Sequence, residues 1–119
     1  MSTLNGRGIL TVEAKTANYT VTEGDCGSVF TNTGASGAVT FALPAASIGL
    51  RYTFVVGATQ ELRIDPNGSE TISLPSSGAA QAAGKYIVAD AQGEKVDIAC
   101  VKAGTWAVLS YVGTWTAEA

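Results

Sequence analysis

The sequence predicts an all-β, single-domain protein: a β-sandwich or a jelly-roll-like β-barrel of about 8 to 10 short strands. Apolar residues recur at every second position through much of the chain, which is the period of a strand with one buried face. No window keeps apolar residues at i, i+3, i+4 and i+7 over the three turns of a typical helix. Turn-forming residues recur about every 8 to 12 positions, a spacing typical of sandwiches and barrels.

The alternating segments define the expected strands, taken in order along the chain. They are Ile9–Val12, Asn18–Thr22, Ser28–Asn32, Val39–Leu43, Arg51–Val56, Glu61–Asp65, Thr71–Leu74, Tyr86–Ala91, Lys95–Val101 and Thr105–Tyr111. The segments between them, such as EGDCG, NTGASG and AQGE, supply Gly, Asn and Asp for tight turns. DPNGS lies between two apolar-faced segments, which predicts a hairpin there.

The segment VTFALPAASIGLRYTFVV contains a corner between two strands. Pro44 has no N–H for a sheet ladder and biases Leu43 toward an extended conformation, so the first strand is expected to stop there. The small residues that follow let the chain turn with little bulk. Both strands are expected to face a shared core, whose predicted members are Val39, Phe41, Leu43, Tyr52, Phe54, Val56, Leu62, Ile64, Ile72, Leu74, Val96, Ile98, Cys100, Trp106 and Val108.

Length and composition limit the classes of protein to consider. The chain has 119 residues, and no shift in composition marks a second domain, so residues 9–119 are predicted to form one domain after a polar N-terminal arm, residues 1–8. The net charge is −3, and the seven basic residues are scattered, which argues against a nucleic-acid partner. No segment approaches the roughly 20 apolar residues of a membrane span, and none resembles a signal peptide.

Charged residues make up only 14% of the chain, against the usual fraction of about 25%. Gly, Ala, Ser and Thr take their place, so the surface is expected to be nearly neutral. A monomer usually keeps more surface charge for solubility. The low charge therefore suggests that neighbouring subunits cover part of the surface.

The sequence offers few residues for catalysis, and no catalytic, cofactor-binding or metal-binding residue is predicted. The chain has no His, which removes the commonest general base and the usual zinc ligand. The pairs Asp90 with Glu94 and Asp65 with Glu70 flank turns, where acidic residues are common. Asp65, Asn67 and Glu70 offer oxygen atoms to Ca²⁺ but lack the full twelve-residue loop, so a turn is favoured.

The remaining candidates are also better explained as structure. Cys26 and Cys100 lie far apart in the sequence, without the spacing of a metal or redox pair, and both are interpreted as structural. The loops GASG and GATQ lack the spacing of a phosphate-binding motif. At the C-terminal end, SYVGTWTAEA places Tyr111 at the end of the last expected strand and Trp115 after it, where a large aromatic either folds onto the core or docks on a partner.

Several of these segments resemble a β-rich module that recurs in virion proteins of tailed bacteriophages. The resemblance rests on YTVTEGDCGSVFTNTGASGAVTFALPAASIGLRYTFVV, LRIDPNGSETI and GTWAVLSYVGTW, and it spans roughly residues 18 to 115. Its marks are the TNTG turn, the apolar strand ending in Leu-Pro, the Asp-Pro-Asn-Gly hairpin and the closing Gly-Thr-Trp. Cys26 departs from the module, where a small residue such as Ser or Ala is expected.

The resemblance implies a structural, non-enzymatic virion protein, made in a bacterial host cytoplasm and located on the capsid surface. A chain carrying this module alone resembles a capsid decoration, or cement, protein that bridges neighbouring major capsid proteins. The implied partners are the major capsid protein and further copies of the chain, as a homotrimer or alternatively a dimer. Candidate contact residues are Leu4, Arg7, Tyr111 and Trp115. The alternatives are a fibre module for host attachment and a carbohydrate-binding sandwich that uses Tyr111 and Trp115 as stacking platforms.

Overall fold

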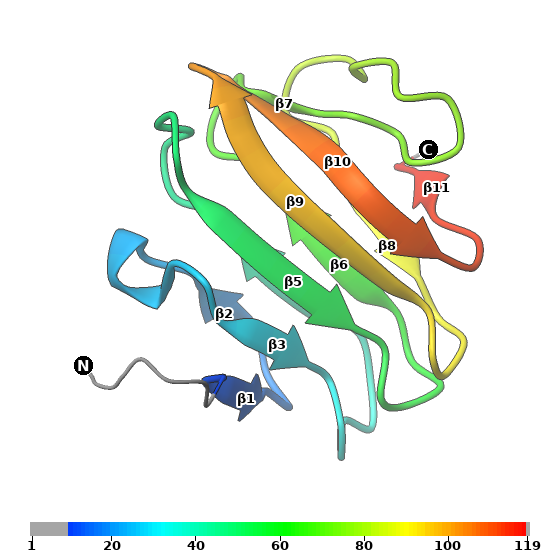
Figure 1. The fold of residues 1–119 in the computed structure, drawn as a ribbon. Coiled ribbons are helices and arrows are strands. Elements are labelled where there is room, and N and C mark those ends of the chain that lie inside the picture. The colour runs from blue at the N-terminus through cyan, green and yellow to red at the C-terminus, as the bar shows by residue number, and fades with distance from the viewer. Residues whose placement is uncertain (1–9, 119) are drawn as a thin grey trace.

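The computed structural model describes residues 10–118 and confirms an all-β sandwich of two sheets (Figure 1). The six-stranded sheet has the order β1-β3-β5-β9-β10-β7, with bounds Val12–Ala14, Val29–Thr31, Arg51–Val55, Lys95–Lys102, Thr105–Val112 and Thr71–Ile72. The five-stranded sheet has the order β11-β8-β6-β4-β2, with bounds Thr116–Ala117, Ile87–Ala89, Leu62–Asp65, Val39–Ala42 and Tyr19–Thr20. Among the described residues, no helix is long and apolar enough to cross a bilayer. The predicted arm, residues 1–8, lies outside them.

The chain winds between the two sheets instead of folding back within one. Strands β1, β3 and β5 are neighbours in the larger sheet and run parallel, while β2, β4 and β6 do the same in the smaller sheet. The sandwich therefore lacks the antiparallel neighbours of a jelly roll in this half. The cause lies in the connections, each of which carries the chain across to the other sheet. The Leu43–Pro44 corner is one of them, and it joins β4 to β5.

The Asp65–Gly68 turn corrects one prediction. Gly68 takes the positive φ of 55° that the sequence requires of the turn, and the Glu70 N–H donates to the Asn67 carbonyl at 2.9 Å. However, β6 pairs with β4 and β8, whereas β7 pairs with β10 in the other sheet. The segment is a turn between sheets and not a hairpin, because the partners on each side satisfy its strands separately.

The C-terminal part contains the one pair of consecutive strands that form a ladder in the described chain. β9 and β10 run antiparallel over eight residues each, and their register shifts between Thr105 and Ala107 and again between Val108 and Ser110. After β10 the chain crosses to the smaller sheet, where β11 pairs with β8. The two Gly-Thr-Trp segments, which begin at Gly104 and Gly113, start β10 and lead into β11.

The core lies between the sheets and agrees with the predicted list. All of the predicted core residues are buried except Leu74 and Val108, which are half-buried and pack against it. Phe30, Phe41 and Phe54 form its centre, with ring centroids 5.3 to 5.7 Å apart. The core also includes residues that were not predicted, namely Val21, Phe30, Ala46, Ile87, Ala89 and Trp115.

Asn32, in the TNTG turn, is a fully buried polar residue. Its Oδ1 accepts hydrogen bonds from the N–H groups of Gly57 and Ala58 at 2.8 and 3.1 Å, and its Nδ2 donates to the Gln60 carbonyl at 3.1 Å. These three groups belong to the loop between β5 and β6, so one side chain fixes that loop. The turn packs so closely that a Cβ on Gly57 would lie 2.0 Å from Oγ1 of Thr33. Only glycine fits there.

A short 3-10 helix, η1 (Glu23–Asp25), is held by the carboxylate of Asp25. Its Oδ2 accepts from the N–H of Thr22 at 2.9 Å, from the Thr22 hydroxyl at 3.1 Å and from the Tyr19 hydroxyl at 3.0 Å. Burial alone would raise the pKa of Asp25, but these hydrogen bonds and the charge of Lys15 hold that pKa below its usual value. Deprotonated Asp25 therefore stabilises the folded chain.

Asp25→Asn is expected to destabilise the protein more at pH 7 than at acidic pH. Because the pKa of Asp25 is lower when folded, its contribution is complete above the unfolded value of about 3.9 and is lost as the pH falls through the folded value. The carboxylate is only partly buried, so the difference should be about 1 kcal/mol or less. Urea unfolding of both proteins at pH 7 and near pH 2.5 measures it. Equal differences at the two pH values would contradict the role of the ionised carboxylate.

Candidate interaction surface

The candidate contact residues of the sequence fall in different places. Leu4 and Arg7 lie outside the described residues. Tyr111 is 43% exposed on β10, but Trp115 is only 3% exposed and belongs to the core. The indole Nε1 of Trp115 donates to the Lys95 carbonyl at 3.0 Å, so its polar edge is satisfied within the chain. Of the two C-terminal aromatics, Tyr111 is therefore the one with an open face.

The predicted carboxylate pairs are engaged in holding loops. The two oxygens of Glu94 accept from the N–H groups of Ala91 and Thr114 at 3.0 and 2.7 Å, which ties the β8–β9 turn to the segment before β11. Gly113 lies against the same side chain, with a φ of 88° and room for no Cβ. Glu70 accepts from the N–H of Ala46 at 2.9 Å, which anchors the Leu-Pro corner. Both glutamates act as structural acceptors.

Acidic residues do gather at one hollow of the smaller sheet. It has a volume of ≈ 220 Å³ and is lined by Glu61, Val88, Ala89, Asp90, Glu94, Thr114 and Thr116. Within residues 10–118, no three His, Cys, Asp or Glu side chains are placed to hold a metal ion together. Two of the acids already have partners, since Glu61 pairs with Arg63 at 2.6 Å and Glu94 holds backbone N–H groups.

The remaining titratable candidates are Asp65, near Glu118, and the two cysteines. Burial raises the pKa of Asp65, and the nearby charge of Glu118 raises it further. Glu118 itself accepts from the N–H of Tyr86 at 3.0 Å, which secures the end of β11 against the chain before β8. Cys26 is exposed and Cys100 is buried, and neither forms a disulfide.

The strongest candidate surface is the outer face of the larger sheet, defined by the outward side chains of β1, β3, β5, β9 and β10. It lies toward the viewer in Figure 1, with no other segment of the described chain in front of its centre. Register fixes which residues share it: Val12 lies opposite Val29, and Val29 lies opposite Thr53. Thr53 is opposite Asp97, which is opposite Ser110. The face thus crosses five strands.

Large apolar side chains stand exposed on this outer face and beside it. Val12, Val101 and Val112 are 59%, 63% and 50% exposed, and Leu109, in the β10 bulge, is 53% exposed. Alternation along β9 places Val101 outward with Lys95, Asp97 and Ala99. Isolated exposed apolar residues are ordinary, but several on one uncovered sheet face are typical of a protein contact surface.

The charges at the centre of the outer face neutralise each other. The Arg51 guanidinium makes a two-pronged contact with Asp97, with Nη2–Oδ2 at 2.6 Å and Nε–Oδ1 at 3.1 Å. The Thr53 hydroxyl donates to the same carboxylate at 3.3 Å. Beside Arg51, a hollow of ≈ 330 Å³ is lined by Leu10, Gly27, Val29, Arg51, Tyr52 and Thr53. The face is therefore nearly neutral and indented at one end.

This outer face was not predicted from the sequence, although the sequence carries a signal for it. In AVLSYV, residues 107–112, apolar residues occupy adjacent positions, so one buried face cannot accommodate them all. Outward Val12 and Val101 also break the rule that the solvent face of a strand is polar. A search for apolar residues on the polar phase of each strand would have indicated the larger sheet.

Together, the fold and this surface define an all-β sandwich with one uncovered, nearly neutral and partly apolar sheet face. A scan against models of protein families finds no match for the chain, and a search of curated proteins finds none either.

Proposed function

We propose that this chain is a structural protein of a tailed-phage virion that decorates the capsid and bridges neighbouring major capsid proteins. The observation that carries the proposal is the outer face of the larger sheet, on which Val12, Val101 and Val112 stand exposed around a neutralised ion pair. Such a face suits a broad contact with another protein, because its burial releases apolar surface from water and leaves little charge unpaired.

Other features support a structural role. The carboxylates singled out in the sequence, Glu70 and Glu94, accept hydrogen bonds from backbone groups. The segments that resemble phage virion modules include strands β3, β5, β7 and β10 of the larger sheet. Copies of the chain, associated as a trimer or a dimer, would combine several weak contacts with the capsid into one durable attachment.

The alternatives use the molecule differently. A carbohydrate-binding sandwich would stack sugars on Tyr111 and Trp115, but Trp115 is 3% exposed and offers no platform. A fibre module for host attachment would use the same outer face at another place on the particle. Immunogold labelling of virions separates these two virion roles, because the proposal expects gold over the head and a fibre module expects it at a tail or fibre tip.

Binding to capsids tests the proposal directly. Purified protein is mixed with capsids of the phage that encodes it, prepared without this protein, and is sedimented with them. Val101→Lys places a charge on the outer face and should weaken binding about tenfold or more, which corresponds to about 1.4 kcal/mol. Asn67→Lys adds the same charge in the exposed turn after β6 and should bind as the parent does.

Two results would overturn the proposal. One is failure of the parent protein to bind the capsids, with no loss of heat resistance in particles that lack it. The other is equal binding by the Val101→Lys and parent proteins, which would place the contact elsewhere on the sandwich. Circular dichroism melting of both variants confirms that they are folded.

A further inference from the structure

Strand β10 presents a long edge that the other edge strands do not. On the side away from β9, no described strand pairs with β10 beyond Trp106, because β7 pairs only with Thr105 and Trp106. The other edge strands, β1, β7, β2 and β11, are two or three residues long. Natural sheets avoid unwanted pairing by keeping their edges short or charged. We propose that residues 110–112 of β10 pair, antiparallel, with the same strand of a second copy of this chain.

The hydrogen-bond alternation shows which backbone groups face the open edge. The Cys100 N–H donates to the Leu50 carbonyl, and the Val56 N–H donates to the Glu94 carbonyl. The backbone N–H and C=O groups of the even-numbered residues of β9 therefore point toward β5. The backbone N–H and C=O groups of the odd-numbered residues of β9, such as Lys95 and Asp97, therefore point toward β10. Their partners there are Val112 and Ser110.

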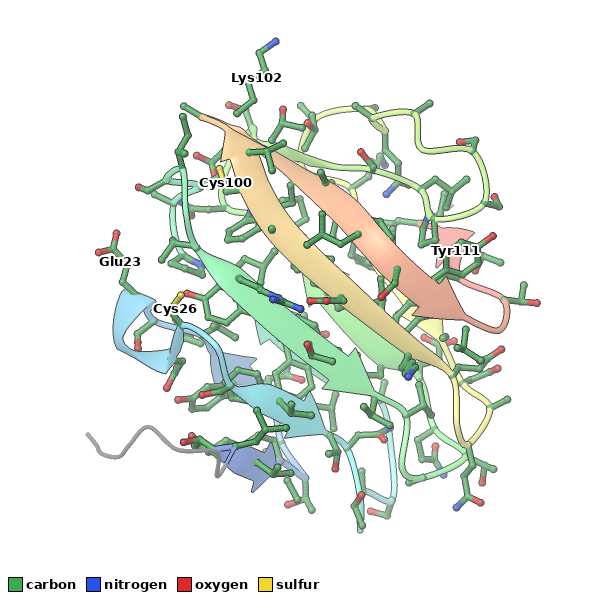
Figure 2. All side chains as sticks on the ribbon, viewed as in Figure 1. Glu23, Cys26, Cys100, Lys102 and Tyr111 are labelled. Carbon is green, nitrogen blue, oxygen red and sulfur yellow. The ribbon has the colours of Figure 1, made fainter. Side chains whose placement is uncertain are left out.

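Tyr111 lies between those two partners and opposite Val96. By the same alternation, its N–H and C=O point away from β9, toward the open edge. No described strand other than β9 pairs with this part of β10. Figure 2 places the Tyr111 side chain on the side of β10 remote from β9. Tyr111 thus offers one donor and one acceptor to an incoming strand.

The chemistry of this edge fits a second copy. β10 carries no charged residue from Thr105 to Val112, so two copies can lie side by side without repulsion. A two-fold axis through Tyr111 lets its N–H and C=O in one copy meet those of the other, and sets Ser110 opposite Val112. The pairing also covers Tyr111 and Val112, which are 43% and 50% exposed in the single chain.

The register shift in β10 limits the pairing to the strand end. It falls between Val108 and Ser110, where Leu109 is the extra residue, so the regular ladder resumes at Ser110. Two such strands join two six-stranded sheets edge to edge. The two outer faces then lie side by side and present one extended surface to a partner.

The mass of the full chain in solution tests the pairing and does not depend on capsid binding. Sedimentation equilibrium at increasing concentration should give twice the chain mass of 12.1 kDa. Tyr111→Lys puts two like charges at the two-fold axis and should shift the dimer dissociation constant upward at least tenfold. Val101→Lys adds the same charge on the outer face away from the edge and should leave the dimer intact.

Cross-linking gives a second readout on folded protein. With exposed Cys26 replaced by serine, Tyr111→Cys should form a disulfide-linked dimer on mild oxidation, because facing residues of such a pair lie about 5.5 Å apart. Val101→Cys in the same background should stay monomeric on a denaturing gel. A mass of one or three chains, or equal cross-linking at both positions, would overturn the pairing. Capsid binding by the Val101 variants is scored separately, so either proposal can fail alone.

Discussion

Asn32→Ala is expected to lower the free energy of unfolding by about 3 kcal/mol or more, because three backbone groups lose their partner at about 1 to 3 kcal/mol each. The groups are the N–H of Gly57, the N–H of Ala58 and the carbonyl of Gln60. Asn32 is fully buried, whereas these groups are half-buried, so water recovers part of the loss. Urea unfolding followed by tryptophan fluorescence measures the change.

Asn18→Ala is the matched control for this substitution. The Asn18 side chain accepts a single hydrogen bond, from the Thr40 N–H at 2.8 Å, and it is exposed. Its removal should cost about 1 kcal/mol or less, since water replaces the lost partner. Equal effects of the two substitutions would show that Asn32 does not hold the β5–β6 loop as described.

Trp115→Ala is expected to destabilise the chain by about 3 to 5 kcal/mol, the usual cost of emptying a buried tryptophan site. The ring is 3% exposed, and its Nε1 bonds the Lys95 carbonyl, so the substitution removes both packing and a hydrogen bond. Trp115→Phe keeps an aromatic ring and loses the donor, and should cost less. Thermal and urea unfolding of the purified variants give the values.

Tyr111→Ala provides the contrast, because Tyr111 is the exposed aromatic of the same region. Its loss should leave the stability of the isolated chain within about 1 kcal/mol of the parent. If Trp115→Ala unfolded at the same denaturant concentration as the parent, the indole could not be part of the core. It would then return as a contact residue for a partner.

Much of the fold was predictable because strand alternation is a local property of the sequence. Phe41, Phe54 and Ile98 occupy the inward phase of their segments and are buried, as their spacing indicates. Phe30 was missed because Val29 and Phe30 are adjacent apolar residues, so the expected strand Ser28–Asn32 does not show which phase is buried. Trp115 was missed because the pull of a large ring toward either a core or an interface cannot be decided without the fold.

The pairing of the strands was not predictable from local pattern. The DPNGS turn has the chemistry of a hairpin, yet turn chemistry does not specify whether the next strand joins the same sheet. Asn32 looked like an ordinary turn residue, since nothing in TNTG announces three partners in a loop some 25 residues further on. The uncovered outer face likewise emerges only once five strands are placed side by side.

The winding of the chain between sheets also sets the order in which the protein can fold. Pairing of parallel neighbours such as β3 and β5 must close a loop that contains the whole of β4, which costs conformational entropy. β9 and β10 are joined by a short turn between Lys102 and Thr105 and pair without that cost. The β9–β10 hairpin therefore has the lowest cost of loop closure among these pairings, and we expect it to act as the folding nucleus.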